Sequence, residues 1–191
     1  SDDDSYLGGS KYRDDVLYDP NDARDKRSIM ENTLNEGETL YSQLIDQINL
    51  LSLDEEEKQL MEYILGWLDD DGLLKKSPII MAEELMIYQG IDVDAEKLTG
   101  LIEQLKSLDP AGIGASSLQE CLLIQVERRK KSAVTTIMKR ILRDYYDDFI
   151  HRNWKLIYRK IDEEEELIDD AFHEITRLNP RPGAGLGEVV S

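Results

Sequence analysis

The sequence contains a run of three aspartates, Asp69, Asp70 and Asp71, which is a candidate for acid–base catalysis or cation binding. Paired acids do general acid–base work and bind hard cations. The run lacks the spacing and the closing glutamate of a calcium loop, and Gly72 follows it directly. A glycine suits the left-handed backbone position just past a helix end. The pattern therefore favours a turn that ends a helix.

The remaining reactive side chains are scattered. His151 and His173 each stand alone among helix-forming residues, and Cys121 lies on an apolar helical run where a buried, inert thiol is expected. No glycine-rich phosphate loop or nucleophile elbow is present in the sequence. We therefore expect no enzymatic activity, no metal, no cofactor and no small-molecule substrate.

The charge balance limits the partners of the chain. Its 191 residues carry 23 Lys and Arg against 41 Asp and Glu, a net charge of −18. Because nucleic-acid binding relies on clustered cations that release counterions, a stand-alone nucleic-acid binder is disfavoured. The single cysteine cannot form an internal disulfide, and no stretch approaches the roughly 20 apolar residues of a membrane span. The sequence thus favours a soluble cytoplasmic protein with a basic or mixed protein partner and no membrane.

The charge is unevenly distributed. Residues 1–40 carry −6, residues 41–110 carry −11 and residues 161–191 carry −7, whereas residues 111–160 carry +6. The positive segment is interpreted either as a solvated helix face or as a docking surface for an acidic patch or passing nucleic acid. Its central part, here named the basic cluster, consists of Arg128, Arg129, Lys130, Lys131, Lys139, Arg140 and Arg143.

Every secondary-structure element that the sequence predicts is a helix. Apolar residues recur at helical spacing from Thr39 onward, with no strand-like alternation, which predicts an all-α fold. Capping signals at Asp54, Asp94 and Ser117, and Pro78 in a first turn, mark helix starts. The predicted helices cover about 39–51, 55–68, 78–90, 95–108, 118–129, 133–151, 154–160 and 162–178.

An internal repeat is visible when the chain is shifted by 70 residues. Residues 84–92 then lie over 154–162, sharing Ile, Tyr, Ile and Asp, the apolar positions of 98–108 fall on those of 168–178, and Pro110 falls on Pro180. Each copy has the outline of a helix-turn-helix. The longer helix of the second copy is strongly acidic and would repel phosphates, so these units are expected to dock proteins or serve as scaffold rather than read DNA.

Four motifs in a fixed order carry a resemblance to a known family. They comprise residues 43–48 (QLIDQI), 68–74 (LDDDGLL), 108–115 (LDPAGIGA) running into 118–123 (LQECLL), and 178–183 (LNPRPG). Together they resemble the core-binding region of the RpoN-type, or sigma-fifty-four, bacterial sigma factor. The resemblance covers roughly residues 39–183. The family pattern has a second proline where this chain has Ala111 and an Arg-Asp pair where it has Ser116-Ser117, which puts in doubt any contact made through that arginine.

The resemblance implies a fragment that binds core RNA polymerase in enhancer-dependent transcription initiation. It also implies that promoter DNA and the ATPase activator are contacted only through regions before Ser1 and after Ser191. The expected organisation is a flexible acidic leader (1–38), two helical core-binding subdomains (39–115 and 116–183) and the start of a linker (184–191). Structural or polymerase-docking roles are implied for Asp69, Asp70, Asp71, Gly72, Leu108, Asp109, Pro110, Gly112, Gly114, Asn179, Pro180, Arg181, Pro182 and Gly183.

Two further hypotheses concern charge. The acidic leader could mimic nucleic acid and lie in a basic channel of the polymerase. The composition by itself equally fits an acidic helical adaptor or nucleic-acid mimic unrelated to sigma factors. The first hypothesis places the leader inside the polymerase, whereas the second removes the polymerase as a partner.

Overall fold

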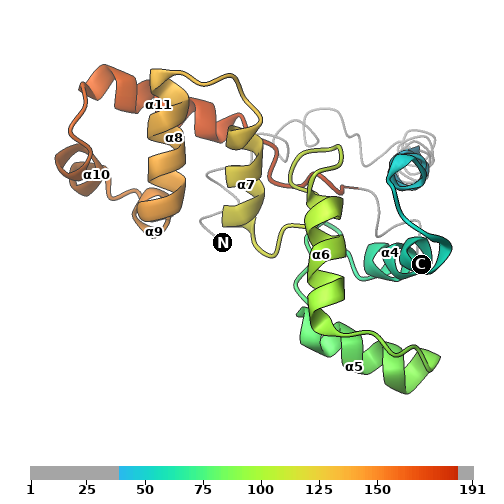
Figure 1. Ribbon diagram of the computed structural model, residues 1–191. Helices are drawn as coiled ribbons and strands as arrows, with labels where there is room; N and C mark the ends of the chain where they lie inside the picture. The colour runs from blue at the N-terminus through green and yellow to red at the C-terminus, as the bar shows by residue number, and fades with distance from the viewer. Residues whose placement is uncertain (1–38, 185–191) are drawn as a thin grey trace, which may run out of the picture. The chain divides into compact units, whose positions relative to one another are not determined.

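The computed structural model describes residues 39–184, and every regular element in that range is a helix (Figure 1). The all-α prediction is therefore confirmed. The predicted leader 1–38 and residues 185–191 of the predicted linker lie outside the described residues. No helix in the described part is long and apolar enough to cross a membrane.

The described residues form two compact units, each with its own apolar core. One unit comprises residues 39–117 together with 181–184, and the other comprises residues 118–180. The chain thus leaves the first unit after Ser117 and returns to it after Pro180. The expected subdomain boundary at 115/116 lies two residues before this division, whereas residues 181–183, expected to end the second subdomain, lie with the first unit.

The first unit begins with a helix over residues 39–50. It continues with α4 (Glu55–Gly66), α5 (Pro78–Gln89) and α6 (Ala95–Lys106), and α6 packs against both α4 and α5. Its core gathers Leu44 and Ile48 from the first helix with the inner faces of the others. The second unit contains α7 (Leu118–Glu127), α8 (Ala133–Asp144), α9 (Tyr146–Ile150), α10 (Trp154–Lys160) and α11 (Glu165–Thr176). Here α8 packs against α7, α9 and α11.

Side-chain caps explain where several helices begin. Asp54 accepts from the backbone N–H of Glu57, whose carboxylate accepts from the Asp54 N–H, as the predicted capping box requires. Asp94 caps α6 as predicted. Ser77 caps α5, whose first residue is Pro78, and Gly90 ends it in the left-handed conformation at φ 66°. These local signals fix the helix ends independently of tertiary packing.

Three predicted helix boundaries were wrong. The helix predicted over 133–151 is broken at Tyr145, whose φ of −130° and ψ of 30° lie outside the helical region. Beyond this break, Phe149 and Ile150 of α9 both enter the core. The helix predicted over 162–178 is shorter, because the backbone of Glu164 is extended. Helix α4 ends at Gly66, so the aspartate run forms a separate turn rather than the end of that helix.

The two units repeat the same helical order. A shift of 78 residues carries the bounds of α4 onto those of α8, although the buried residues of these two helices line up at a shift of 77. A shift of 70 residues carries α6 onto α11 with identical bounds. Residues 101–110 and 171–180 also alternate between buried, half-buried and exposed positions in the same order. The duplication therefore includes α4 and α8, which the 70-residue shift did not reveal, and the segment between the helix pairs is eight residues shorter in the second copy.

The short helices of the repeat are the exception. The 70-residue shift places Ile87 of α5 over Ile157 of α10, yet Ile87 is 72% exposed and Ile157 is buried. The sequence identities in this stretch therefore do not reflect equal environments. Helix α5 buries Met81 and Leu85 instead and turns Ile87 outward.

Candidate functional site

Three of the motif segments meet in the first unit, at a place named here the motif junction (residues 69–74, 112–115 and 181–183). The Gly114 N–H donates to the Gly72 carbonyl at 2.9 Å, and the Leu74 N–H donates to the Ala115 carbonyl at 2.8 Å. The Gly183 N–H donates to the Asp71 carbonyl at 2.9 Å. Segments separated by up to 112 residues are therefore joined by backbone hydrogen bonds.

Glycines are required at the centre of the motif junction. Gly72 has φ 87°, and a Cβ placed on it would lie 2.7 Å from the Gly183 nitrogen. A Cβ on Gly183 would in turn lie 2.4 Å from the Gly72 Cα atom. Gly112 and Gly114 also adopt positive φ, at 98° and 83°, in the tight turn predicted for them. The contact between segments 69–74 and 181–183 depends on two residues without side chains.

The carboxylates of the aspartate run are largely occupied. Asp69 Oδ1 accepts from the backbone N–H groups of Asp71 and Leu73, both at 2.9 Å, and Asp69 also pairs with Lys75 at 3.5 Å. Asp71 Oδ1 accepts from Arg181 Nε at 2.5 Å. Among the described residues, no cluster of three or more His, Cys, Asp or Glu side chains could hold a metal ion. The run acts as a turn that also binds the returning segment.

A pair of glutamines closes the two repeats in the same way. Gln47 Nε2 donates to the Asp109 carbonyl at 2.7 Å, and the Asp109 N–H donates to Gln47 Oε1 at 2.8 Å. In the second unit, Gln125 makes the same two bonds to Asn179, at 2.6 and 2.8 Å. Each glutamine thus holds the residue that precedes Pro110 or Pro180. We name these pairs the glutamine clamps.

The sequence motifs contained the glutamine clamps without revealing them. Gln47 is part of the motif 43–48 and Asp109 part of 108–115, but their pairing required the fold. The signal that could have found them is a second shift: residues 47 and 125 differ by 78, the offset that relates α4 to α8. Leu108 and Leu178, next to the clamped residues, are both buried.

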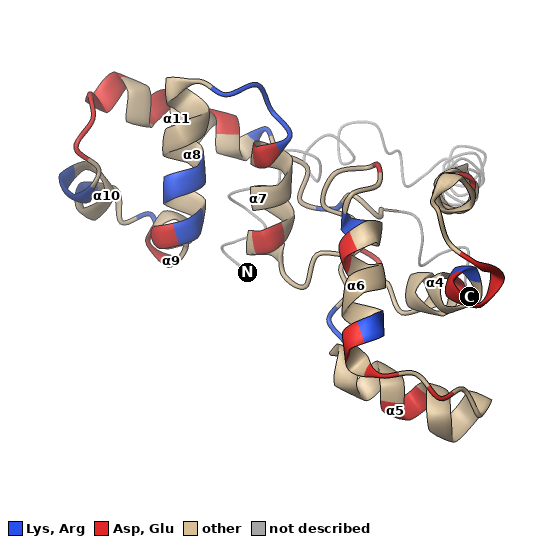
Figure 2. Ribbon diagram, viewed as in Figure 1, with Lys and Arg blue, Asp and Glu red and all other residues tan. Residues whose placement is uncertain are grey.

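The basic cluster lies in the second unit, in the connection from α7 to α8 and along α8 (Figure 2). Much of it is neutralised locally: Arg129 pairs with Glu174 at 2.7 Å, Lys139 with Glu127, and Arg143 with Asp144 at 3.2 Å. Arg140 donates to the Lys160 carbonyl at 3.4 Å, and Arg128 is exposed. Lys130 and Lys131 are also exposed and present their charge to solvent.

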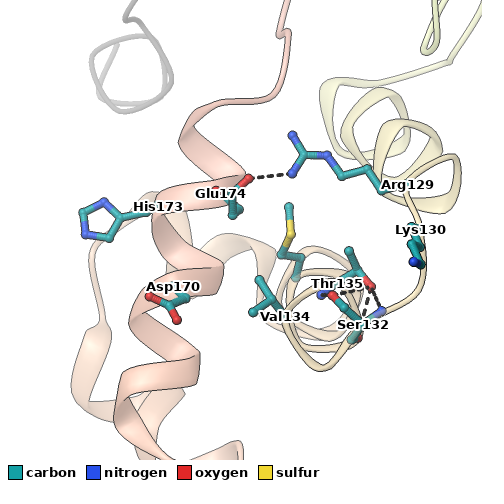
Figure 3. A pocket seen from close by; sticks show the side chains of 9 residues that line it. Arg129, Lys130, Ser132, Val134, Thr135, Asp170, His173 and Glu174 are labelled. Carbon is teal, nitrogen blue, oxygen red and sulfur yellow. Dashed lines mark hydrogen bonds and ion pairs between the residues drawn. The ribbon is translucent and has the colours of Figure 1, made fainter.

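A cavity of about 560 Å³ lies beside the basic cluster, lined by residues of α11 and of the start of α8 (Figure 3). Arg129 and Lys130 contribute positive charge to it, whereas Asp170 and Glu174 contribute negative charge. The Arg129 hydrogen bond lowers the pKa of Glu174, so this carboxylate stays ionised opposite the cation. The mixed lining does not favour an anionic ligand. Cys121 is buried, as expected, and His173 is exposed.

Helix α5 has a feature that the sequence analysis missed. It is apolar almost all round, yet only Met81 and Leu85 are buried. Of the exposed large apolar side chains in the described part, most belong to this one helix: Ile79, Ile80, Met86, Ile87 and Tyr88. The signal was available, since residues 78–89 contain no apolar stripe with an opposite polar face of the kind that a surface helix shows.

Comparison with known proteins agrees with the motif order. Residues 29–190 match the model of the "Sigma-54 factor, core binding domain" family. The RNA polymerase sigma-54 factor of Pseudomonas aeruginosa is 31% identical over 153 residues, covering 78% of this chain and 30% of the relative. That of Bacillus subtilis is 32% identical over 149 residues, covering 78% of this chain and 32% of the relative. The chain spans about a third of the length of these relatives. On these matches, the chain belongs to the sigma-54 factor core binding domain family.

Proposed function

We propose that this chain binds bacterial core RNA polymerase as the core-binding part of a sigma-54 factor. The observation that carries the proposal is the family match over residues 29–190, in a chain whose motif segments converge at one junction. An acidic adaptor unrelated to sigma factors is not favoured, because it would not share the family.

The motif residues divide into two proposed roles. Gly72, Pro182 and Gly183 are buried at the motif junction, and we assign them to holding the returning segment in place. The glutamine clamps and the residues they bind have the same structural role in each repeat. Exposed residues such as Asp70, Lys130 and Lys131 are free to meet the polymerase. Docking on the enzyme is therefore proposed for side chains outside the hydrogen-bonded junction.

We propose that other functions of a whole sigma-54 factor lie outside this chain. Recognition of promoter DNA and response to an ATPase activator are proposed to reside outside residues 1–191, since the chain spans about a third of the relatives' length. The chain itself is proposed to act by binding, without catalysis or cofactor, in the bacterial cytoplasm where its polymerase partner is found.

A direct binding titration tests the proposal. The 191-residue chain carries a fluorescent label on an added terminal tag. It is titrated with purified bacterial core RNA polymerase while fluorescence anisotropy is recorded. Because Cys121 is buried, the terminal tag is the better position for the label. Saturable binding that unlabelled chain reverses is expected. Absence of saturable binding at micromolar polymerase would refute the proposal.

The docking role of the basic cluster needs its own variant. Lys130→Glu/Lys131→Glu reverses two exposed charges. Lys155→Glu/Arg159→Glu is the matched control, because both residues are exposed on α10 outside the basic cluster. Exposed charges at an interface act mainly on association rate and salt dependence. Lys130→Glu/Lys131→Glu should therefore bind more slowly and with a weaker response to salt than the control. Equal association rates for the two variants would leave the basic cluster as a solvated surface.

A further inference from the structure

Most of the large apolar side chains left exposed in the described residues belong to α5. Ile79 is 64% exposed and Ile87 72%, and Ile80 and Met86 are each nearly half exposed. In Figure 2, α5 is almost wholly free of colour for charge apart from one acidic patch. Monomeric proteins seldom leave contiguous apolar patches in water, and patches of this kind mark interaction sites.

The spacing of these residues places them on one side of the helix. Positions 79, 83, 86 and 87 follow the i, i+4, i+7 and i+8 pattern, so Ile79, Glu83, Met86 and Ile87 share a face. Met81 and Leu85 lie on the opposite side and are buried in the core of the first unit. One side of α5 thus packs on the core of the first unit. Its opposite side presents a row of side chains of the type that recognises another amphipathic element.

The charged side chains around the outward face of α5 indicate what kind of segment could bind to it. Glu83 lies within the apolar face, is exposed, and makes no ion pair among those of the described residues. Glu84, on the flank, pairs with Lys76 at 2.5 Å, and the connection to α6 adds the acidic side chains of Asp92 and Asp94. An apolar segment with basic residues at its edges would complement this surface.

Two other occupants fit the charge less well. Residues 1–38 of the chain carry 5 basic and 11 acidic side chains, so they repel the acidic surroundings of α5. A second copy packed about a two-fold axis along this face would bring one Glu83 toward the other, which costs free energy at an apolar interface. Both therefore remain as outcomes that an experiment can distinguish.

We propose that the outward face of α5, formed by Ile79, Ile80, Met86 and Ile87 around Glu83, is a docking site for an apolar segment of core RNA polymerase flanked by basic residues. This inference rests on the proposed function and locates one of its contacts. The face supplies apolar contact area, and Glu83 supplies the pairing that sets which segment fits.

The test compares two pairs of variants of the full 191-residue chain in the core polymerase titration. Ile79→Ser/Ile87→Ser should weaken binding about tenfold or more, the loss typical of removing interface anchors. Leu50→Ser is the matched control, because Leu50 is 87% exposed in the same unit but away from α5, and it should bind within about twofold of the parent. Thermal unfolding should be nearly unchanged in both, since the substituted side chains are exposed.

Glu83→Lys tests the charge. It should weaken binding by several-fold and reduce the effect of added salt, whereas Glu62→Lys, an exposed reversal on α4, should do neither. If the parent chain binds the polymerase and Ile79→Ser/Ile87→Ser binds equally well, the inference is wrong while the proposed function stands. If the parent does not bind, both fail. A parent chain that dimerises in sedimentation and becomes monomeric in the double variant would also overturn the inference, because a second copy then covers the face.

Discussion

At the motif junction, Gly72 and Gly183 lie so close together that neither position has room for a Cβ atom. A methyl group on Gly183 would meet backbone atoms of Gly72, which cannot move aside as the end of a flexible side chain can. We predict that Gly183→Ala lowers the free energy of unfolding by about 1–3 kcal/mol, as overpacking does. Urea denaturation measures the change, and amide exchange at position 183 should accelerate because its hydrogen bond to Asp71 is displaced.

The control for this substitution lies in α6. Gly100 is helical and has nothing within 4 Å of an added Cβ. Gly100→Ala should therefore stabilise the chain by about 0.5–1 kcal/mol through helix propensity. Opposite signs for the two substitutions are required. If Gly183→Ala were as stable as the parent, the close packing of segments 69–74 and 181–183 would be disproved.

The ion pair between Arg129 and Glu174 gives a prediction in pH. The Arg129 hydrogen bond lowers the pKa of Glu174 below its ordinary 4.5, so the pair stabilises the fold above that pH and is lost as pH falls through the folded-state pKa. The pair is a third exposed, and its contribution should stay below about 1 kcal/mol. Glu174→Gln should thus be less stable than the parent at pH 7, with the difference shrinking below about pH 4. A difference in the free energy of unfolding between Glu174→Gln and the parent that is the same at every pH would contradict this.

At the scale of elements, the glutamine clamps join the first helix of each repeat to the end of its last. In each clamp, two hydrogen bonds between the glutamine and the backbone replace hydrogen bonds to water. Each of them contributes about 0.5–1.5 kcal/mol net to the free energy of unfolding. Gln47→Ala and Gln125→Ala should each lower the free energy of unfolding by about 1–3 kcal/mol, with similar values in the two repeats. Gln47→Glu keeps the acceptor for the Asp109 N–H but places a carboxylate oxygen against the Asp109 carbonyl, and should cost at least as much as Gln47→Ala. A negligible effect in both repeats would show that the clamps do not hold the helices together.

Local signals made most helices predictable. Asp54, Asp94 and Pro78 mark their helix starts because capping acts within four residues. The break at Tyr145 was not predictable, since the apolar spacing of 137, 141, 145 and 149 continues across it and only packing shows that the chain turns. The repeat was also only partly predictable. Its 70-residue shift is visible in the sequence of the last helices. The 78-residue shift of the first helices leaves few identical residues, and only the bounds of α4 and α8 in the structure show it.

For the whole molecule, the two cores are separate sets of residues. Phe149 is buried in the second, beside Trp154 and Phe172 with ring centroids 5.6 and 5.8 Å away. Phe149→Ala should cost about 3–5 kcal/mol in that unit. Hydrogen exchange should then accelerate in α8 and α11 while α4 and α6 stay protected. Equal loss of protection in all four helices would mean that the units unfold together.

The candidate site was partly predictable at this scale. The motif residues were identified as a set, but their convergence was not, because contacts across 41 to 112 residues have no local signal. The basic cluster was visible as charge, whereas its neutralisation by Glu127, Asp144 and Glu174 depends on helix packing. The exposed face of α5 was missed because the prediction for residues 78–90 rested on the signals at their two ends and did not assign the faces of the helix.

If the chain binds core polymerase as proposed, it should occupy the surface that sigma-54 factors use. The most direct measurement is competition: a complex of Bacillus subtilis core RNA polymerase and its labelled full-length sigma-54 factor, a relative 32% identical over 149 residues, is titrated with the unlabelled chain. The unlabelled chain should displace the factor completely, following a single-site competition curve. A labelled factor that stays bound at saturating concentrations of the chain would contradict it.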